Sequence, residues 1–478
     1  MKKIFLRNIM KFALLLPLLA INACGDFDDT NIDPNRPTFV PTAGLLTAAM
    51  RPLGNTSYSF QGTLYSQHIA ETQYTTSSRY EQVRFDFNGF YDGVLTDLQE
   101  VIRLNTDPET SGRAAESGSN NNQIAIARIL KAYYFHIATD RWGDLPYSEA
   151  LKGTENLTPS YDTQEFIYRD LFNELKEAVS QIDNGLAVSG DIVFAGDMSA
   201  WTKFANSLRM IMALRLSEAD ASLAQSEFNG ALNAGVIDSN ADNVVYQYLA
   251  EATNQNIWFE EFLTRVDYAV SNTMIDHLKN SNDPRLPAYA DPNINGEYVG
   301  RQYGVSASEP FDQVSLPSTG TIRRQDAPAY VLTHAQILFS KAEAAQRGWI
   351  SGSAEDFYND AIRASMEQWG VFDQAAYDAF IAQPEIAFDS GTALEQIGTQ
   401  KWVALYLQGY EAWFEWRRTG FPDLQPAQDA LNNSGNIPVR QGYPASERDI
   451  NSVNYLDAVS RFGGEEMDGL DTSVWWDK

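Results

Sequence analysis

The stretch "VLTHAQILFSKAEAAQRGWISGSAEDFYNDAIRASMEQWG", Val331 to Gly370, gives the clearest indication of how this chain folds. Its apolar residues recur every three to four positions on both sides of an interruption from Gly348 to Ser353. That spacing predicts two amphipathic helices joined by a short turn. Alanines stand where two helices can approach closely, and large side chains lie between them. We therefore expect a tightly packed helical hairpin.

The same periodicity recurs along most of the chain. It predicts further long helices within residues 122–147, 162–182, 197–220 and 393–420. In the first of these helices, one face carries Ile126, Ile129, Leu130, Tyr133 and Ile137. Irregular stretches rich in Gly, Pro, Asn and Tyr interrupt the helices, roughly over residues 50–92, 237–330 and 421–478. Long ordered loops on a helical scaffold are where function tends to lie.

The hairpin at Val331–Gly370 resembles a tetratricopeptide-type unit, although no strict period of about 34 residues runs through the chain. The predicted fold class is mainly α. Hairpins of this type would form a scaffold that carries long irregular loops and minor β structure. Residues 39–478 are expected to form a single domain.

Composition narrows the possible partners. The net charge is −28, and binding to nucleic acid or another polyanion requires clustered positive charge. The acidity also disfavours acidic peptides and uronate-rich polysaccharides, so neutral ligands fit better. Cys24 is the only cysteine in the chain, which excludes an intramolecular disulfide and leaves burial to stabilise the fold.

The beginning of the chain indicates a lipoprotein signal. Basic residues from Lys2 to Lys11 precede an apolar run, Phe12–Ala20, which is too short to span a bilayer. The following "INAC" resembles a bacterial lipobox, in which the cysteine is lipidated after cleavage. Residues 1–23 are then a signal peptide, and residues 24–38 are the lipid anchor at Cys24 and a flexible tether. An ordinary signal peptide with an incidental cysteine is the alternative.

Signatures of catalysis and metal binding are missing from the sequence. It contains no H-E-x-x-H, G-x-S-x-G or G-x-x-x-x-G-K-[ST] motif. The four histidines, His68, His136, His277 and His334, lie far apart, and a structural role is favoured for each. No cofactor or metal is expected. Paired carboxylates for glycoside hydrolysis remain possible, because the chain has 63 acidic residues.

Aromatic residues among polar ones in the irregular stretches indicate a carbohydrate site. Sugar rings stack their C–H faces on aromatic rings, and their hydroxyl groups need amide or guanidinium partners. The stretches 57–93, 254–262 and 285–304 combine these residue types. The candidate ligand contacts are Tyr74, Arg79, Tyr80, Trp258, Asn256 and Tyr303.

Several motifs taken together resemble the SusD/RagB family of outer-membrane nutrient-binding lipoproteins. The most specific are "WGDLPY" (142–147) and "GYEAWFEWRRTGFP" (409–422). The lipobox with "NIDPNRPT" (31–38), "SNDPRLPAYADP" (281–292) and "IPVRQGYPASERDINSVNYLDAV" (437–459) extend the resemblance over residues 24–478. It implies a non-catalytic, cell-surface protein that captures oligosaccharides and delivers them to a SusC-like TonB-dependent β-barrel transporter. No ligand contact can be carried over by a motif.

The shared motifs themselves favour structural roles. Glu411, Arg417 and Arg418 are expected to pair around Trp413 and Trp416 as part of the scaffold. The nearest functional alternative is a RagB-like peptide-binding subunit of an importer. A glycoside hydrolase on a helical scaffold and a helical-repeat adaptor that binds only protein are alternatives from other classes.

Overall fold

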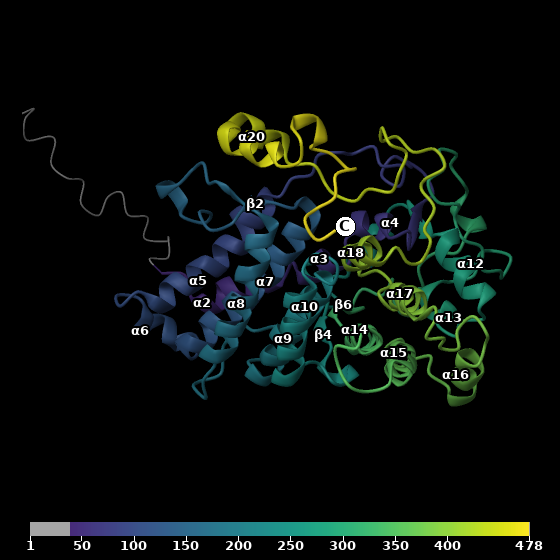
Figure 1. Ribbon diagram of the computed structural model, residues 1–478, viewed down its shortest axis with the longest axis horizontal. Coiled ribbons are helices and arrows are strands. Elements are labelled where there is room, and N and C mark those ends of the chain that lie inside the picture. The colour runs from purple at the N-terminus through teal and green to yellow at the C-terminus, as the bar shows by residue number, and fades with distance from the viewer. Residues whose placement is uncertain (1–38, 478) are drawn as a thin grey trace, which may run out of the picture. The chain divides into compact units, whose positions relative to one another are not determined.

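Helices account for most of residues 39–477, the part of the chain that the computed structural model describes (Figure 1). The first helices are α2 (Thr42–Met50), α3 (Leu53–Ser57), α4 (Phe60–Tyr65), α5 (Thr96–Thr106), α6 (Ser111–Ala114), α7 (Asn120–Trp142), α8 (Gln164–Gln181), α9 (Met198–Arg215) and α10 (Ala221–Ala234). The later ones are α11 (Ile257–Glu261), α12 (Asn272–Asn280), α13 (Leu286–Tyr289), α14 (His334–Gln346), α15 (Ala354–Gln368), α16 (Gln374–Ile381), α17 (Ala393–Ala404), α18 (Gly409–Thr419), α19 (Ala445–Ile450) and α20 (Ser452–Ser460). The mainly α fold class is confirmed.

The chain divides into two units, Met1–Pro41 and Thr42–Lys478, and the features below belong to the second. The predicted signal peptide, the anchor at Cys24 and the tether up to residue 38 lie outside the described residues. Within residues 39–477, no helix is long and apolar enough to cross a membrane.

Consecutive helices pack as hairpins. Helix α7 packs against α5 and α8, α9 packs against α8 and α10, and α14 packs against α15. The predicted apolar face of α7 is buried in full, together with most of the rest of that helix. Burial of each large aliphatic side chain stabilises the fold by roughly 1.5–3 kcal/mol.

The predicted hairpin at Val331–Gly370 is confirmed, with its turn at the expected place. Helix α14 ends shortly before Gly348, whose φ of 73° is the left-handed conformation that glycine adopts without strain. Helix α15 starts after Ser353, whose side chain accepts a hydrogen bond from the backbone N–H of Asp356. Both helix ends are therefore specified by local sequence.

Three short antiparallel sheets connect the irregular stretches. Strand β1 (Ile69–Glu71) pairs with β5 (Tyr268–Val270), β2 (Leu145–Pro146) with β3 (Tyr161–Asp162), and β4 (Val244–Tyr246) with β6 (Ala329–Leu332). Two of these sheets join segments that lie far apart in the sequence. The stretches predicted to be irregular also contain short helices, α3, α4, α11–α13, α19 and α20.

The prediction of one continuous helix over residues 393–420 is wrong. The chain leaves the helical conformation between α17 and α18, and Leu407 has a φ of 67°. The cause is the packing of α4 against the start of α18, where Gly62 and Gly409 bring two backbones into contact. His68 stabilises the break, because its Nδ1 accepts a hydrogen bond from the backbone N–H of Leu407. Its Nε2 lies 3.1 Å from the carbonyl of Trp402.

A buried ion cluster lies where α9, α14, α17 and α18 meet. Its members are Arg215, Glu343, Lys401, Glu411, Glu415 and Arg418. Arg215 donates to both Glu411 and Glu415, and Arg418 donates to Glu343 and Glu415 at 2.7 and 2.8 Å. Burial opposes ionisation of Glu415, but the cations Arg418, Lys401 and Arg215 hold its pKa well below the usual range.

The expected scaffold role of "GYEAWFEWRRTGFP" is thus confirmed, but one expected pairing is not. Glu411 pairs with Arg215 of α9 rather than with an arginine of its own helix. Arg417 instead lies over the Trp413 and Trp476 rings, 4.1 and 4.4 Å from their centroids.

The contact between the two glycines gives the first prediction. A Cβ atom on Gly409 would lie 2.1 Å from the backbone nitrogen of Thr63, so one of the two backbones would have to shift to make room. We expect Gly409→Ala to lower the free energy of unfolding by about 2 kcal/mol or more, measured by urea denaturation. The control is Gly44→Ala in α2, where nothing lies within 4 Å of the new methyl group. There the helix should be unchanged or stabilised by up to about 1 kcal/mol. Equal effects of the two substitutions would contradict the close approach.

Candidate functional site

The candidate site is built on β1 and β5, which bring two irregular stretches together. Glu71 pairs with Tyr268 in the ladder. Beyond this pair, the backbone N–H of Thr72 donates to the carbonyl of Asp267 at 2.7 Å, and the side chain of Gln73 donates to the Asp267 carboxylate at 2.8 Å. These bonds place Tyr74 directly beside the segment 263–267.

Tyr74 is held in an unusual conformation with its ring in solvent. Its φ is 54°, and the residue is 68% exposed. The Arg265 guanidinium lies 5.2 Å from the ring centroid and also pairs with Asp267. A non-glycine residue in this conformation costs of order 1–3 kcal/mol, and such residues cluster at binding sites. The neighbouring turn is fixed by Glu71, whose carboxylate accepts two hydrogen bonds from Ser78 at 2.9 Å.

Arg301 joins a third segment to this site. Its Nε donates to the carbonyl of Glu71 at 2.9 Å, and its guanidinium also binds the Glu309 carboxylate and the carbonyl of Ala307. The backbone N–H of Glu309 donates to the carbonyl of Thr72 at 3.0 Å. Phe311, two residues further on, is 51% exposed.

We call the exposed side chains Tyr74, Leu263, Arg265 and Phe311, carried by these three joined segments, the Tyr74 surface. Arg265 and Tyr74 are in direct contact, and Leu263 and Phe311 are exposed side chains on the same joined segments. Of these four residues, only Tyr74 was among the candidate contacts predicted from the sequence. Phe311 could have been found as a lone aromatic residue in the polar, Pro-containing "SEPFDQ". Leu263 and Arg265 carry no such signal.

Arg79 contacts another segment of the chain, the loop at 427–431. Its Nε donates to the carbonyl of Asp429 at 2.7 Å, and its own carbonyl accepts from the N–H of Leu431. The Asp429 carboxylate in turn accepts two bonds from Ser306 at 2.7 Å. Arg79 is partly exposed, so a ligand contact there stays a prediction, although one of its donors already holds the loop at 427–431.

Two of the predicted contacts, Trp258 and Asn256, are part of the core instead. Trp258 is 0% exposed and packs edge-on against Phe60, with 4.6 Å between ring centroids. The side chain of Asn256 caps α11 by accepting from the N–H of Trp258 at 2.7 Å, and donates to the carbonyl of Ala327. Neither side chain is accessible to a sugar, so their predicted ligand role is wrong.

The same correction applies to Tyr80 and Tyr303, which are both buried. The Tyr80 hydroxyl accepts from the N–H of Ala427 at 3.1 Å, and the Tyr303 hydroxyl donates to the carbonyl of Leu64 at 2.7 Å. Burial raises the pKa of Tyr80 to about 12. These rings hold the loops together in the interior, and of the six predicted contacts only Tyr74 and Arg79 are exposed or partly exposed.

The histidines take structural positions. Burial lowers the pKa of His68 to about 3, so its ring stays neutral and holds the break between α17 and α18. His136 is buried beside Asp140, 3.1 Å away. Within residues 39–477, no group of His, Asp and Glu side chains is arranged to hold a metal ion.

Comparison with known proteins identifies the family. The family model named SusD-like, described as starch-binding and associating with the outer membrane, matches residues 34–444. A solved chitin-binding protein is 30% identical, with a TM-score of 0.80 over 91% of this chain and 99% of that one. A SusD homologue from Bacteroides fragilis is 26% identical, with a TM-score of 0.80 over 92% and 100% of the two chains.

A chitin-binding SusD homologue from Flavobacterium johnsoniae is 24% identical, with a TM-score of 0.75 over 91% of this chain and 98% of that one, which supports the fold alone. No curated protein matches the chain. The chain therefore belongs to the SusD-like family of carbohydrate-binding proteins associated with the outer membrane. The family and fold expected from the motifs are confirmed.

The exposure of each aromatic residue predicts how much its substitution changes the free energy of unfolding. We expect Trp258→Ala to lower the free energy of unfolding by about 3–5 kcal/mol, because it leaves a large cavity. Tyr74→Ala should change it by less than about 1 kcal/mol, because the ring is in solvent. Urea denaturation followed by far-UV circular dichroism measures both values. A Trp258→Ala protein as stable as the unsubstituted chain would contradict the burial of that ring.

Proposed function

We propose that the protein is a non-catalytic cell-surface subunit that captures neutral oligosaccharides at the Tyr74 surface. The observation that supports this most directly is the exposed Tyr74 ring, held in a strained conformation with the Arg265 guanidinium beside it. An aromatic face suits the C–H face of a sugar, and a guanidinium donates to its hydroxyl groups.

The proposed ligand is a neutral glycan because of charge and similarity. A chain with a net charge of −28 repels polyanions at long range. The 30% identical solved protein is described as chitin-binding, so oligosaccharides of chitin are the first neutral ligands to test. Capture is proposed to require no cofactor, because stacking and hydrogen bonding are sufficient for sugar binding.

Delivery completes the proposed role. A protein anchored through Cys24 to the outer membrane, with its body at the cell surface, would pass the glycan to a SusC-like TonB-dependent transporter. The family's association with the outer membrane supports this arrangement. A ligand-binding loop surface on a rigid helical body suits transfer, because the ligand need not be enclosed to be held.

The binding site can be tested by affinity electrophoresis in gels that contain a soluble chitin derivative, with a reducing-end assay on the same glycan. We expect the protein to be retarded without forming new reducing ends. Tyr74→Ala should weaken binding roughly tenfold, the equivalent of about 1.4 kcal/mol of stacking energy. The control is Phe166→Ala, which removes an exposed aromatic side chain from α8 and should leave retardation unchanged.

Each other outcome of this experiment identifies a different alternative. New reducing ends would indicate a glycoside hydrolase instead. Retardation that both variants retain would place the glycan site elsewhere on the molecule. Absence of retardation in gels of several neutral glycans would favour a RagB-like peptide-binding subunit, to be tested with a peptide library.

The lipid anchor gives a separate prediction. Cys24→Ser removes the thiol that would carry the diacylglycerol, and a thioether lipid is what would retain the mature protein at the membrane. We expect this variant to move from the membrane pellet to the soluble fraction after cell lysis, with incorporation of labelled palmitate lost. If the variant still pelleted with the membrane and still incorporated palmitate, Cys24 would not be the anchor.

A further inference from the structure

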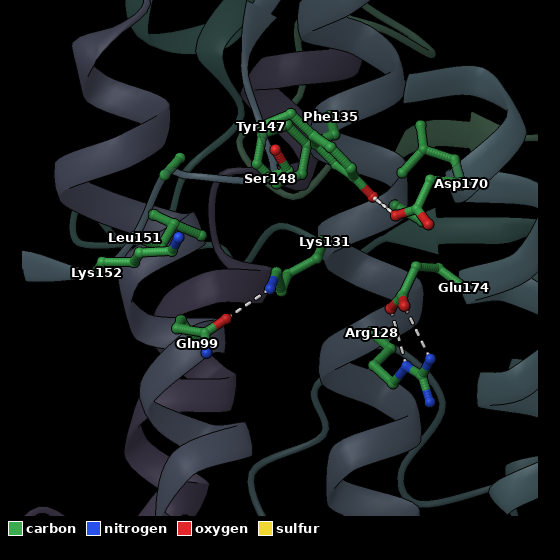
Figure 2. A pocket seen from close by; sticks show the side chains of 13 residues that line it. Gln99, Arg128, Lys131, Phe135, Tyr147, Ser148, Leu151, Lys152, Asp170 and Glu174 are labelled. Atoms are coloured by element: carbon green, nitrogen blue, oxygen red, sulfur yellow. Dashed lines mark hydrogen bonds and ion pairs between the residues drawn. The ribbon is translucent and has the colours of Figure 1, made fainter. Parts of the chain in front are cut away.

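A polar pocket opens in the helical part of the body, and it shares no residue with the Tyr74 surface (Figure 2). Helices α5, α7 and α8 and the segment 147–152 form its walls, and its volume is about 300 Å³. The lining residues used below are Gln99, Arg128, Lys131, Tyr147, Asp170 and Glu174. We call this the Lys131 pocket.

Both carboxylates of the pocket already have partners. Glu174 accepts two hydrogen bonds from Arg128, each at 2.9 Å, and Arg128 also pairs with Glu177. Asp170 accepts from the Tyr147 hydroxyl at 2.6 Å. Figure 2 shows these two pairs on one side of the pocket. Arg128 is thus neutralised by glutamates and is not available to a ligand.

Lys131 differs from Arg128 in having no acidic partner. Its ammonium donates to the uncharged Gln99 Oε1 at 2.6 Å, and among residues 39–477 no carboxylate forms an ion pair with it. Burial lowers the pKa of Lys131, the Glu174 and Asp170 carboxylates oppose this shift, and Arg128 adds to it. An ammonium group has three donors, so the pocket contains a partly buried cation with unused hydrogen-bonding capacity.

The walls around Lys131 are fixed. Phe135 and Tyr147 pack edge to face, with 4.7 Å between centroids. Glu149 holds the two ends of the loop after Tyr147 together. Its carboxylate accepts hydrogen bonds from the N–H and the hydroxyl of Ser160 at 3.1 and 2.9 Å. A ligand would therefore enter a site that is already formed, and would spend little free energy on ordering it.

We propose that the Lys131 pocket binds a hydroxylated monocarboxylate about the size of one sugar acid, with its carboxylate on the Lys131 ammonium. Gln99 and Ser148 supply polar partners for hydroxyl groups at the rim. Lys152 adds an exposed positive charge to the same wall.

The charges of the pocket favour one negative charge on the ligand. The lining carries Arg128, Lys131 and Lys152 against Asp170 and Glu174, and Glu177 outside the lining also pairs with Arg128, so the two lysines are the cations of the lining with which no carboxylate of residues 39–477 forms an ion pair. A neutral sugar would leave the ammonium without a direct ion pair. A phosphate dianion would place a second negative charge near Asp170 and Glu174, where it is repelled.

Calorimetry on the purified full-length protein tests the proposal with D-glucuronate, D-glucose and D-glucose 6-phosphate. We expect glucuronate to bind at least about tenfold more tightly than either of the other two, because a charge-assisted hydrogen bond contributes more than a neutral one. Binding of glucose at equal strength, tighter binding of the phosphate, or no heat from glucuronate would each overturn the proposal.

Two variants locate the effect. Lys131→Met keeps most of the side-chain volume and should weaken glucuronate binding at least about tenfold. Gln99→Glu gives Lys131 an internal carboxylate and should block binding while retaining the packing, which keeps the test decisive if Lys131→Met fails to fold. The control is Lys341→Met, because Lys341 is also a half-buried lysine on a hairpin helix and burial also lowers its pKa.

A second titration shows whether the pocket receives a free sugar acid or the acidic end of an oligosaccharide. An oligosaccharide that ends in glucuronate should bind as tightly as the free acid if the pocket receives chain ends, and at least tenfold more weakly if it receives free sugar acids. Glucuronate affinity that is unchanged in both Lys131→Met and Gln99→Glu would overturn the site. Loss of chitin binding in Tyr74→Ala bears on the Tyr74 surface alone, so the two proposals fail independently.

Discussion

The buried ion cluster between α9, α14, α17 and α18 is the interaction on which the rest of the body depends. An isolated charge in such a position would cost several kcal/mol, so each carboxylate must lie where its cations can reach it. Removing one partner from a pair of this kind costs about 3–5 kcal/mol, more than the intact pair contributes. Apolar contacts between helices tolerate small sliding movements, whereas sliding α9 along α18 would pull Arg215 away from Glu411 and Glu415. We infer that the cluster fixes the register of the hairpins against one another.

A short length of chain links the segment that carries Tyr74 to the helical scaffold. Helix α4 is held against α18 by the contact between Gly62 and Gly409, and His68 then supports the break before α18. Strand β1 begins at the next residue, Ile69, and pairs with β5. Tyr74 follows only three residues after the end of that strand, so its backbone is attached closely to the hydrogen-bonded β1–β5 pair. A surface prepared in this way loses little conformational entropy when a ligand binds, and the strain at Tyr74 is offset by the bonds around it.

Sequence predicted the helices well because their signal is local. Ser353 caps α15 and Gly348 ends α14 by interactions within a few residues. The hairpin at Val331–Gly370 could therefore be predicted from its own sequence. The break at Leu407 could not, because it depends on Gly62, which is more than three hundred residues away. The site shows the same limit. Tyr74 and Tyr80 are the same residue type in the same polar stretch, yet one is exposed and the other is buried among Tyr65 and Tyr303. Which aromatic faces water is decided by contacts between segments that are distant in sequence.

The net charge of the protein governs the approach of large charged ligands, whereas the charges inside a pocket govern which small group binds there. The net charge of −28 acts over distance and opposes a long anionic polymer, which must bring many charges close to the whole acidic surface. At physiological ionic strength that field is screened within about 8 Å. A single carboxylate inside a pocket is governed instead by the groups that it touches. Around Lys131, Glu174 is paired with Arg128, Asp170 accepts a hydrogen bond from Tyr147, and the ammonium bonds the uncharged Gln99, so a ligand carboxylate would give it a direct ion pair. Composition therefore argues against polyanions as ligands of this protein, but does not argue against one acid group at one site.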